Sequence, residues 1–169
     1  SSTSRGLGDV YKRQEQYFQE IDKVKGQKGV LSVEKKLFVE TNNGTNRQIR
    51  PVTPEQPLRI GDKVIVRLTI RTDREMNYVF LKDLRAGCFE PADQLSGPES
   101  RDGIWYYRSP KDVSENFFIN RLPEGTFVLE YPVYVSRSGE YAGGISTIQC
   151  MYAPEFVSHT AGESLRIMP

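Results

Sequence analysis

Apolar side chains alternate with charged or polar ones along GDKVIVRLTIRTD, residues 61–73. A period of two puts every second side chain on the same face of an extended chain, as a half-buried antiparallel strand requires. The positions that we expect to face the core are Val64, Val66, Leu68 and Ile70. The core side chains expected from a second alternating segment are Phe127, Leu129 and Val133. This pattern constrains the chain to build a sheet.

Similar alternation recurs along the chain and is interrupted by Gly, Pro, Asn or Asp at short intervals. The other alternating segments are residues 30–40, 76–84, 103–109, 115–122, 125–136, 145–153 and 163–168. The turn-rich segments between them are residues 41–46, 91–103, 122–125 and 136–144. Seven or eight short strands at this spacing predict an all-β protein, an antiparallel immunoglobulin-like or fibronectin-like β-sandwich.

Pro132 interrupts one of these strands. Proline has no backbone N–H to donate to a neighbouring strand, so within sheets it is confined to edges and bulges. We therefore expect an edge or a bulge near Tyr131 to Val133.

The first residues do not share the pattern. Back-translated, SRGLGDVYKRQ (Ser4–Gln14) resembles one reading frame of a transposase adapter used to prepare sequencing libraries, and we interpret residues 1–14 as an adapter-derived artefact. Residues 15–28 are then expected to be a fragment of the preceding domain or a linker, with a pattern that fits either a helix or a broken strand. Residues 29–169 are expected to form the sandwich, at the C-terminal end of a longer protein whose true N-terminus is missing.

The charge balance gives no support to nucleic-acid binding. The formal net charge is +1, and it becomes slightly negative without residues 1–14, which hold Arg5, Lys12 and Arg13 against Asp9 alone. A protein that binds nucleic acid draws its affinity from a surplus of basic side chains, which is absent here. No apolar run approaches the roughly 20 residues of a membrane-spanning helix, so we expect no membrane insertion by this segment.

Groups suited to catalysis or metal binding are few. The sequence holds one histidine, His159, and two cysteines, Cys88 and Cys150. A Cys-His hydrolase or a zinc site needs such residues close together, and their spacing singles out none of them. No glycine-rich phosphate loop is present, and we interpret the aspartates and glutamates as solvated surface. We expect no enzyme activity, no metal and no cofactor.

The two cysteines lie on separate predicted strands or loops. A disulfide would need their Cα atoms within about 7 Å of one another, and strands usually bury lone cysteines as small apolar groups. We therefore expect Cys88 and Cys150 to be free thiols.

Several motifs occur in a specific order. A Gly-Asp strand entry is followed by an FEP loop, an aromatic strand, RLPEGT, a glycine-rich turn and finally MYAPE. The segments that carry these motifs include residues 58–83, 85–97 and 147–167. In these residues the chain resembles the C-terminal domain of bacterial alpha-2-macroglobulin homologues, over about Leu31 to Ile167.

The resemblance implies a role within a large, multidomain inhibitor that entraps proteases in the periplasm or at the cell envelope. Its partners would be the other domains of the parent chain, including a thioester domain if one is present, and target proteases through the whole parent. The family's thioester motif is Cys-x-Glu-Gln, and CFEP at residues 88–91 has Pro91 where the glutamine is required. CFEP therefore cannot form a thioester. The resemblance implies that this segment is non-catalytic, packs against the thioester domain and shields it.

The resemblance also points to the segment CMYAPEF. In the animal relatives a similar Tyr-x-Pro segment lies against the thioester domain. The residues that we predict to form an interdomain contact are Met151, Tyr152, Pro154, Glu155 and Phe156. An alternative interpretation is that Tyr152 and Phe156 simply cap the core, in which case both would be buried.

A different class of function also fits the sequence. IWYY, residues 104–107, could provide a stacking platform in an adhesive or carbohydrate-binding module. Trp105 and Tyr107 share one face of their strand, although aromatic residues in strands more often pack within the protein. Rings covered by a second sheet would leave no platform.

Overall fold

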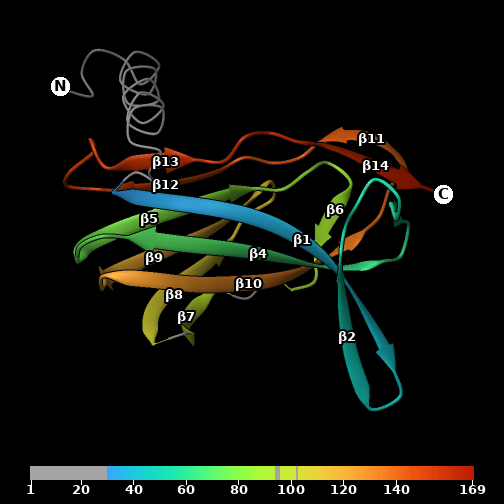
Figure 1. The fold of residues 1–169 in the computed structure, drawn as a ribbon, viewed down its shortest axis with the longest axis horizontal. Helices are drawn as coiled ribbons and strands as arrows, with labels where there is room; N and C mark the ends of the chain where they lie inside the picture. The colour runs from blue at the N-terminus through green and yellow to red at the C-terminus, as the bar shows by residue number, and fades with distance from the viewer. Residues whose placement is uncertain (1–29, 94–95, 102) are drawn as a thin grey trace.

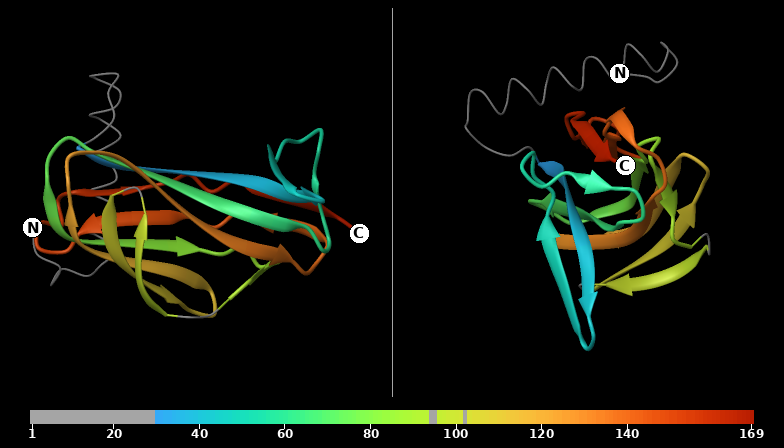
Figure 2. Two further views of the ribbon diagram at one scale, coloured as in Figure 1. Left: turned by 90° about the horizontal axis from the view of Figure 1, so that it is seen from below. Right: turned by 90° about the vertical axis from the view of Figure 1, so that its right-hand side faces the viewer.

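The computed structural model describes residues 30–93, 96–101 and 103–169. Over these residues the chain forms an all-β structure whose strands, apart from one pair, run antiparallel. Two sheets face each other across a shared core, and a smaller sheet lies at one end (Figures 1 and 2). The prediction of an antiparallel β-sandwich is confirmed.

The first sheet has five strands in the order β2-β1-β4-β10-β6. The strands are β2 (Asn46–Pro51), β1 (Leu31–Asn43), β4 (Lys63–Thr72), β10 (Gly125–Val135) and β6 (Phe89–Pro91). β2 and the end of β1 form a hairpin that projects from the sandwich (Figure 1). Its turn contains Gly44 at φ 67°, in the left-handed region that glycine adopts without steric cost.

The second sheet has six strands in the order β13-β12-β5-β9-β8-β7. The strands are β13 (Val157–His159), β12 (Ser146–Cys150), β5 (Met76–Leu84), β9 (Ser114–Leu122), β8 (Ile104–Pro110) and β7 (Gly97–Arg101). β7 lies within residues 91–103, which the sequence analysis assigned to a turn. Its side chains are half-buried or exposed, so it lacks the apolar alternation by which the other strands were found.

The small sheet joins β11 (Gly139–Ala142), β14 (Ser164–Met168) and β3 (Leu58–Arg59). β14 pairs antiparallel with β11 and parallel with β3. Over the described residues the structure has fourteen strands, against seven or eight predicted. The additional strands are β2, β3, β6, β7, β11 and β13, and all of them except the six-residue β2 have two to five residues.

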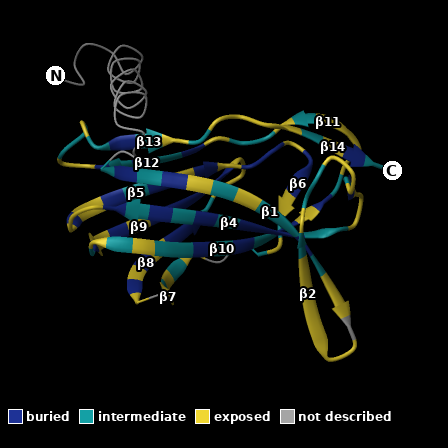
Figure 3. Ribbon diagram, in the orientation of Figure 1, coloured by how far each residue is buried: buried dark blue, intermediate teal, exposed yellow. Residues whose placement is uncertain are grey.

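The predicted core is confirmed. Val64, Val66, Leu68 and Ile70 are at most 1% exposed, and Leu129 and Val133 are fully buried. Phe127 packs against this core while staying partly exposed. Burial alternates along β4 from Val66 onward and along β10 from Leu129 onward, as the period of two requires, while Ile65 near the start of β4 is also buried (Figure 3). Phe117 of β9 and Tyr131 of β10 meet between the two sheets, with their ring centroids 6.1 Å apart.

Pro132 lies where its missing N–H does no harm. The Pro132 carbonyl accepts a hydrogen bond from the Ala92 N–H at 3.4 Å, so the proline nitrogen points to the same side, away from β4. On that side β6 pairs with β10 only from Val133 onward, so Pro132 lies at the point where β10 becomes the edge strand of the sheet. The prediction of an edge near Tyr131 to Val133 is confirmed.

Two predictions concern residues that the structure does not describe. The adapter-derived origin of residues 1–14 and the assignment of residues 15–28 to a preceding domain or linker both fall outside the described residues.

Candidate functional site

The segment predicted to form an interdomain contact connects β12 to β13. Its backbone is fixed by three hydrogen bonds, in which the Ala153 N–H donates to the Cys150 carbonyl at 3.3 Å, the Phe156 N–H to the Ala153 carbonyl at 2.9 Å, and the Cys150 N–H to the Phe156 carbonyl at 3.0 Å. These hydrogen bonds therefore fix the backbone from which the side chains of the turn project.

The side chains of this turn divide into two groups. Tyr152 is 81% exposed and Met151 is 54% exposed, and Glu155 is exposed beside them. Phe156 packs against the core and lies under the Arg74 guanidinium, 5.3 Å from the ring centroid. Pro154 is half-buried. The turn thus presents Met151, Tyr152 and Glu155 to solvent and anchors itself through Phe156.

Tyr78 of β5 supports the turn from the neighbouring strand. Its carbonyl accepts a hydrogen bond from the Met151 N–H at 2.9 Å, and its ring meets Tyr152 edge-on with centroids 5.1 Å apart. Tyr78 has φ 58°, an uncommon backbone conformation for a residue other than glycine. Sequence reasoning missed this residue, because a tyrosine within an alternating strand gives no sign of a positive φ.

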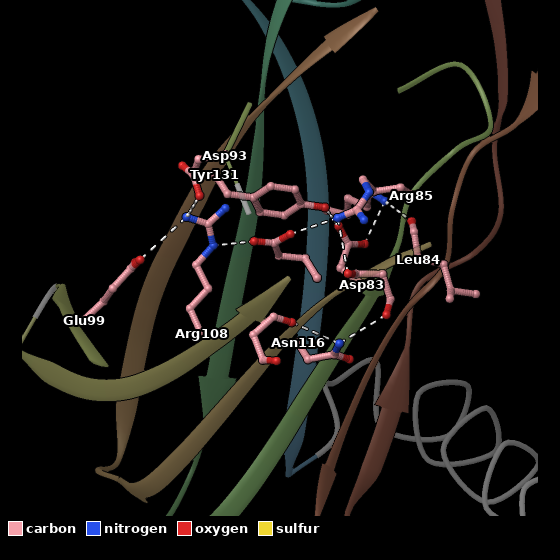
Figure 4. Close-up of polar contacts among 12 residues, drawn as sticks. Asp83, Leu84, Arg85, Asp93, Glu99, Arg108, Asn116 and Tyr131 are labelled. Atoms are coloured by element: carbon pink, nitrogen blue, oxygen red, sulfur yellow. Dashed lines mark hydrogen bonds and ion pairs between the residues drawn. The ribbon is translucent and has the colours of Figure 1, made fainter. Parts of the chain in front are cut away.

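A network of buried charges in the core corrects the prediction that acidic residues form solvated surface. Asp83 of β5 is fully buried and accepts hydrogen bonds from Lys35 Nζ and Ser146 Oγ, each at 2.7 Å, and from the Tyr131 hydroxyl (Figure 4). Lys35 and Tyr131 belong to the five-stranded sheet, whereas Asp83 and Ser146 belong to the six-stranded one. The carboxylate therefore ties the two sheets together.

Glu115 of β9 is the second buried carboxylate. Arg85 Nη1 donates to it at 2.9 Å and Arg108 Nε donates to its other oxygen (Figure 4). Burial raises the pKa of the Glu115 carboxyl, and the two guanidinium groups oppose that rise. Burial, with the Asp83 carboxylate nearby, also raises the pKa of Tyr131 well above its usual value, so this phenol stays a hydrogen-bond donor at neutral pH. These charges serve to hold the fold together.

The cysteines show no sign of nucleophilic activation. Cys88 is fully buried, Cys150 is 6% exposed, and both are free, as predicted. Burial raises the pKa of the Cys88 thiol, which reduces the thiolate needed for attack. In the part of the chain that the structure describes, no group of three or more His, Cys, Asp or Glu side chains could hold a metal ion.

We expect both thiols to resist iodoacetamide in the folded protein, because both cysteines are buried. After unfolding in urea without a reductant, the intact mass should rise by two alkyl groups. Mass spectrometry of native and unfolded samples gives the answer. A disulfide would be revealed if the unfolded, unreduced protein gained no alkyl group.

A groove of about 990 Å³ separates β1 from the segment that leads into β14. Lys35, Lys36 and His159 line it together with Arg166. It contains neither cysteine and none of the five residues predicted for the interdomain contact.

The aromatic residues of β8 are open to water. Trp105 is 71% exposed and Tyr107 is 47% exposed, on the outer face of the six-stranded sheet. The five-stranded sheet covers the opposite face of β8, where Ile104 and Tyr106 are buried. Neither ring is covered by another sheet of the described structure, so the geometry permits a stacking platform.

No helix among the described residues is long and apolar enough to cross a membrane. This observation covers residues 30–93, 96–101 and 103–169 only.

The arrangement described so far defines an antiparallel β-sandwich domain with a pair of buried carboxylates in its core and an exposed turn at residues 151–156. Residues 31–155 match the family model of the bacterial alpha-2-macroglobulin MG10 domain. Because this match takes in well over half of the chain, the chain belongs to that family.

Solved bacterial alpha-2-macroglobulins share the fold. Salmonella alpha-2-macroglobulin reacted with methylamine is 21% identical with a TM-score of 0.64, over 83% of this chain and 9% of that chain. Trypsin-activated alpha-2-macroglobulin from Escherichia coli is 17% identical with a TM-score of 0.63, over 83% and 10%. The native Escherichia coli protein from domain MG7 to the C-terminus is 17% identical with a TM-score of 0.62, over 83% and 24%. This chain therefore spans only a small part of each of them.

Circularly permutated Ras protein 2 of Dictyostelium discoideum is 28% identical over 109 residues, which are 64% of this chain and 3% of that protein. The matched part of that protein is too small to carry its activity to this chain.

Proposed function

We propose that this chain is the non-catalytic, C-terminal macroglobulin-like domain of a large bacterial protease inhibitor that works by entrapment, and that its turn at residues 151–156 packs against the thioester domain. The observation that supports this proposal is the 81% exposure of Tyr152 on a turn whose backbone is fixed by hydrogen bonds. A large side chain held in solvent on a rigid frame is what a contact with another domain requires.

The proposed contact has a chemical purpose. A thioester reacts with water and with amines, so the inhibitor must keep it covered until a protease cleaves the bait segment. An aromatic ring laid over the bond excludes both kinds of nucleophile. Met151 beside Tyr152 adds apolar area to such a cover.

The wider setting is part of the same proposal. The domain would act in the periplasm or at the cell envelope, outside the cytoplasm, and would meet target proteases only through the whole parent. Its direct partners are the other domains of that parent. It needs no cofactor of its own and binds no nucleic acid.

Replacing Tyr152 by alanine in a full-length parent that carries a thioester should make the unactivated protein react several-fold faster with methylamine. The reason is that the ring is exposed within this domain, so its loss uncovers the bond without removing core packing. Thiol release on adding methylamine gives the rate, and differential scanning calorimetry gives the melting temperature, which should not change.

Tyr134→Ala is the matched control, because Tyr134 is 44% exposed on β10 of the other sheet. It should leave the methylamine rate at the level of the parent. If Tyr152→Ala lowers the melting temperature and leaves the rate unchanged, the tyrosine has only a packing role.

The exposure of Trp105 and Tyr107 favours a second candidate function, an adhesive or carbohydrate-binding module. Sugar rings stack on open aromatic faces, and these two rings are open. Titration of the parent with soluble oligosaccharides tests this candidate, since a bound sugar would shield both rings from oxidation.

A further inference from the structure

The outer face of the six-stranded sheet carries a group of neighbouring aromatic side chains. Tyr107 of β8 lies opposite Phe118 of β9, which lies opposite Phe80 of β5. Directly opposed residues share a face of the sheet, so these three rings form a row across three strands. Trp105 lies two residues before Tyr107 and therefore on the same face. We call these four residues the aromatic face.

This face is open in the described structure. Trp105, Tyr107 and Phe118 are 71%, 47% and 41% exposed. The residues that point the other way on the same strands are buried in the core, among them Tyr106 and Phe117. The sheet therefore has aromatic side chains on both sides, although only one side faces the other sheet.

The composition of the aromatic face is that of a protein interface. Tyr, Trp and Phe are enriched and charged residues are depleted at the centre of such interfaces. Single exposed apolar residues need no explanation, whereas a contiguous apolar patch marks an interaction site. Asn120, two residues after Phe118 on β9 and so on the same face, is uncharged, and the exposed Lys82, two residues after Phe80 on β5, borders the aromatic face.

The arrangement of the rings favours a protein over a sugar. Phe80 and Phe118 stack on each other, with centroids 4.8 Å apart and planes inclined by 26°. Each of these two rings covers part of the other's face, so they cannot both lie flat beneath a sugar ring. A protein surface needs only the combined apolar area that they present.

The aromatic face continues into the turn that presents Tyr152. Tyr78 lies two residues before Phe80 on β5, and its exposed ring contacts Tyr152 edge-on. The two surfaces are thus neighbours on the same sheet. Moreover, this chain covers only 9% to 24% of the bacterial alpha-2-macroglobulin chains described above, so most of a parent of that kind lies outside it. A domain joined to the same chain is present at high effective concentration.

We propose that the aromatic face docks another domain of the same parent chain, and that the turn at residues 151–156 forms the rim of this larger interface. This inference rests on the proposed function, because it takes the chain to be one domain of a multidomain inhibitor. It adds that Trp105 and Tyr107 lie at the centre of the contact, where aromatic side chains contribute most to binding.

Hydroxyl-radical footprinting of the full-length parent tests the proposal with an internal reference. Tyr107 and Tyr134 are the same residue type and are 47% and 44% exposed in this domain. If the aromatic face is docked, Tyr107 should be oxidised several-fold more slowly than Tyr134 in the parent. Equal oxidation rates would overturn the proposal.

A variant that introduces a charge into the aromatic face provides a second test. Trp105→Asp in the parent should bring the oxidation rate of Tyr107 up toward that of Tyr134, because a carboxylate cannot be buried in an apolar contact without a partner. Ile60→Asp is the matched control, since Ile60 is 48% exposed and lies outside the aromatic face. A rate for Tyr107 that stays low in Trp105→Asp would contradict the proposal.

The outcomes separate this inference from the proposed function. Slow oxidation of Tyr107 together with an unchanged methylamine rate in Tyr152→Ala would support docking of the aromatic face and contradict the shielding role of Tyr152. Fast oxidation of Tyr107 together with an accelerated methylamine rate in Tyr152→Ala would contradict docking of the aromatic face and support the shielding role of Tyr152. Protection of Tyr107 that appears only when soluble oligosaccharides are added would identify a sugar platform and overturn the docked domain.

Discussion

Replacing Asp83 by asparagine should lower the free energy of unfolding by about 3–5 kcal/mol, the range found when one partner of a buried ion pair is removed. Asp83 is fully buried and its carboxylate is the counter-ion of Lys35, whose side chain is 12% exposed. Asparagine keeps the shape but not the charge, so the Lys35 ammonium would remain inside the protein without an anion. Urea unfolding followed by circular dichroism measures the loss.

Asp73→Asn is the matched control for this prediction. Asp73 pairs with Arg74 at 2.9 Å, but both side chains are more than half exposed. Water screens such a pair, so its removal should cost less than about 1 kcal/mol. Similar losses for Asp83→Asn and Asp73→Asn would contradict the role given to the buried network.

A second substitution tests the cause of the loss. Lys35→Met removes the stranded ammonium, and the double variant Lys35→Met/Asp83→Asn should therefore be more stable than Asp83→Asn alone. If the double variant loses the sum of the two single losses, the cost of Asp83→Asn does not come from an unpaired charge.

The alternation that predicted the core also indicated that some charged side chains are buried. Val79 and Leu81 are buried on β5, and the same period of two places Asp83 on the inward side. Glu115 on β9 and Arg108 on β8 fall on the inward side of their strands in the same way. A charged residue in an inward position indicates a buried partner. The partner itself could not be predicted, because it lies on a different strand and depends on how the sheets pack.

The sequence could not predict the exposure of Trp105 and Tyr107, for a related reason. Trp105 and Tyr107 alternate with Ile104 and Tyr106, so both faces of the first half of β8 are apolar and the pattern does not say which one is covered. The packing of the five-stranded sheet decides it, because that sheet covers the face that holds Tyr106. The strands β2, β3, β6, β7, β11 and β13 were also missed, and FEP at residues 89–91 forms β6 where a loop was predicted. These strands are short and most of their side chains are half-buried or exposed, so they show no clear period.

Gly144→Ala should destabilise the domain by about 3 kcal/mol or more, because the added methyl group would overlap backbone that cannot move freely. A Cβ at Gly144 would lie 1.6 Å from the Leu84 carbonyl oxygen and 2.4 Å from the Leu84 carbonyl carbon. Leu84 ends β5, and its N–H donates to the Ile145 carbonyl at 3.0 Å. The two segments must separate to admit the methyl group, which breaks this hydrogen bond.

Gly97→Ala is the control, since nothing lies within 4 Å of a Cβ there, and its cost should stay within about 0.5 kcal/mol. The separation forced by Gly144→Ala also reaches the ion pair, because Lys35 Nζ donates to the Gly144 carbonyl at 3.1 Å and to the Leu84 carbonyl at 3.2 Å. The losses of Gly144→Ala and Asp83→Asn should therefore be less than additive in the double variant, since both disturb the same ammonium group. Additive losses in urea unfolding would mean that the close approach at Gly144 and the ion pair at Asp83 stabilise the sandwich independently.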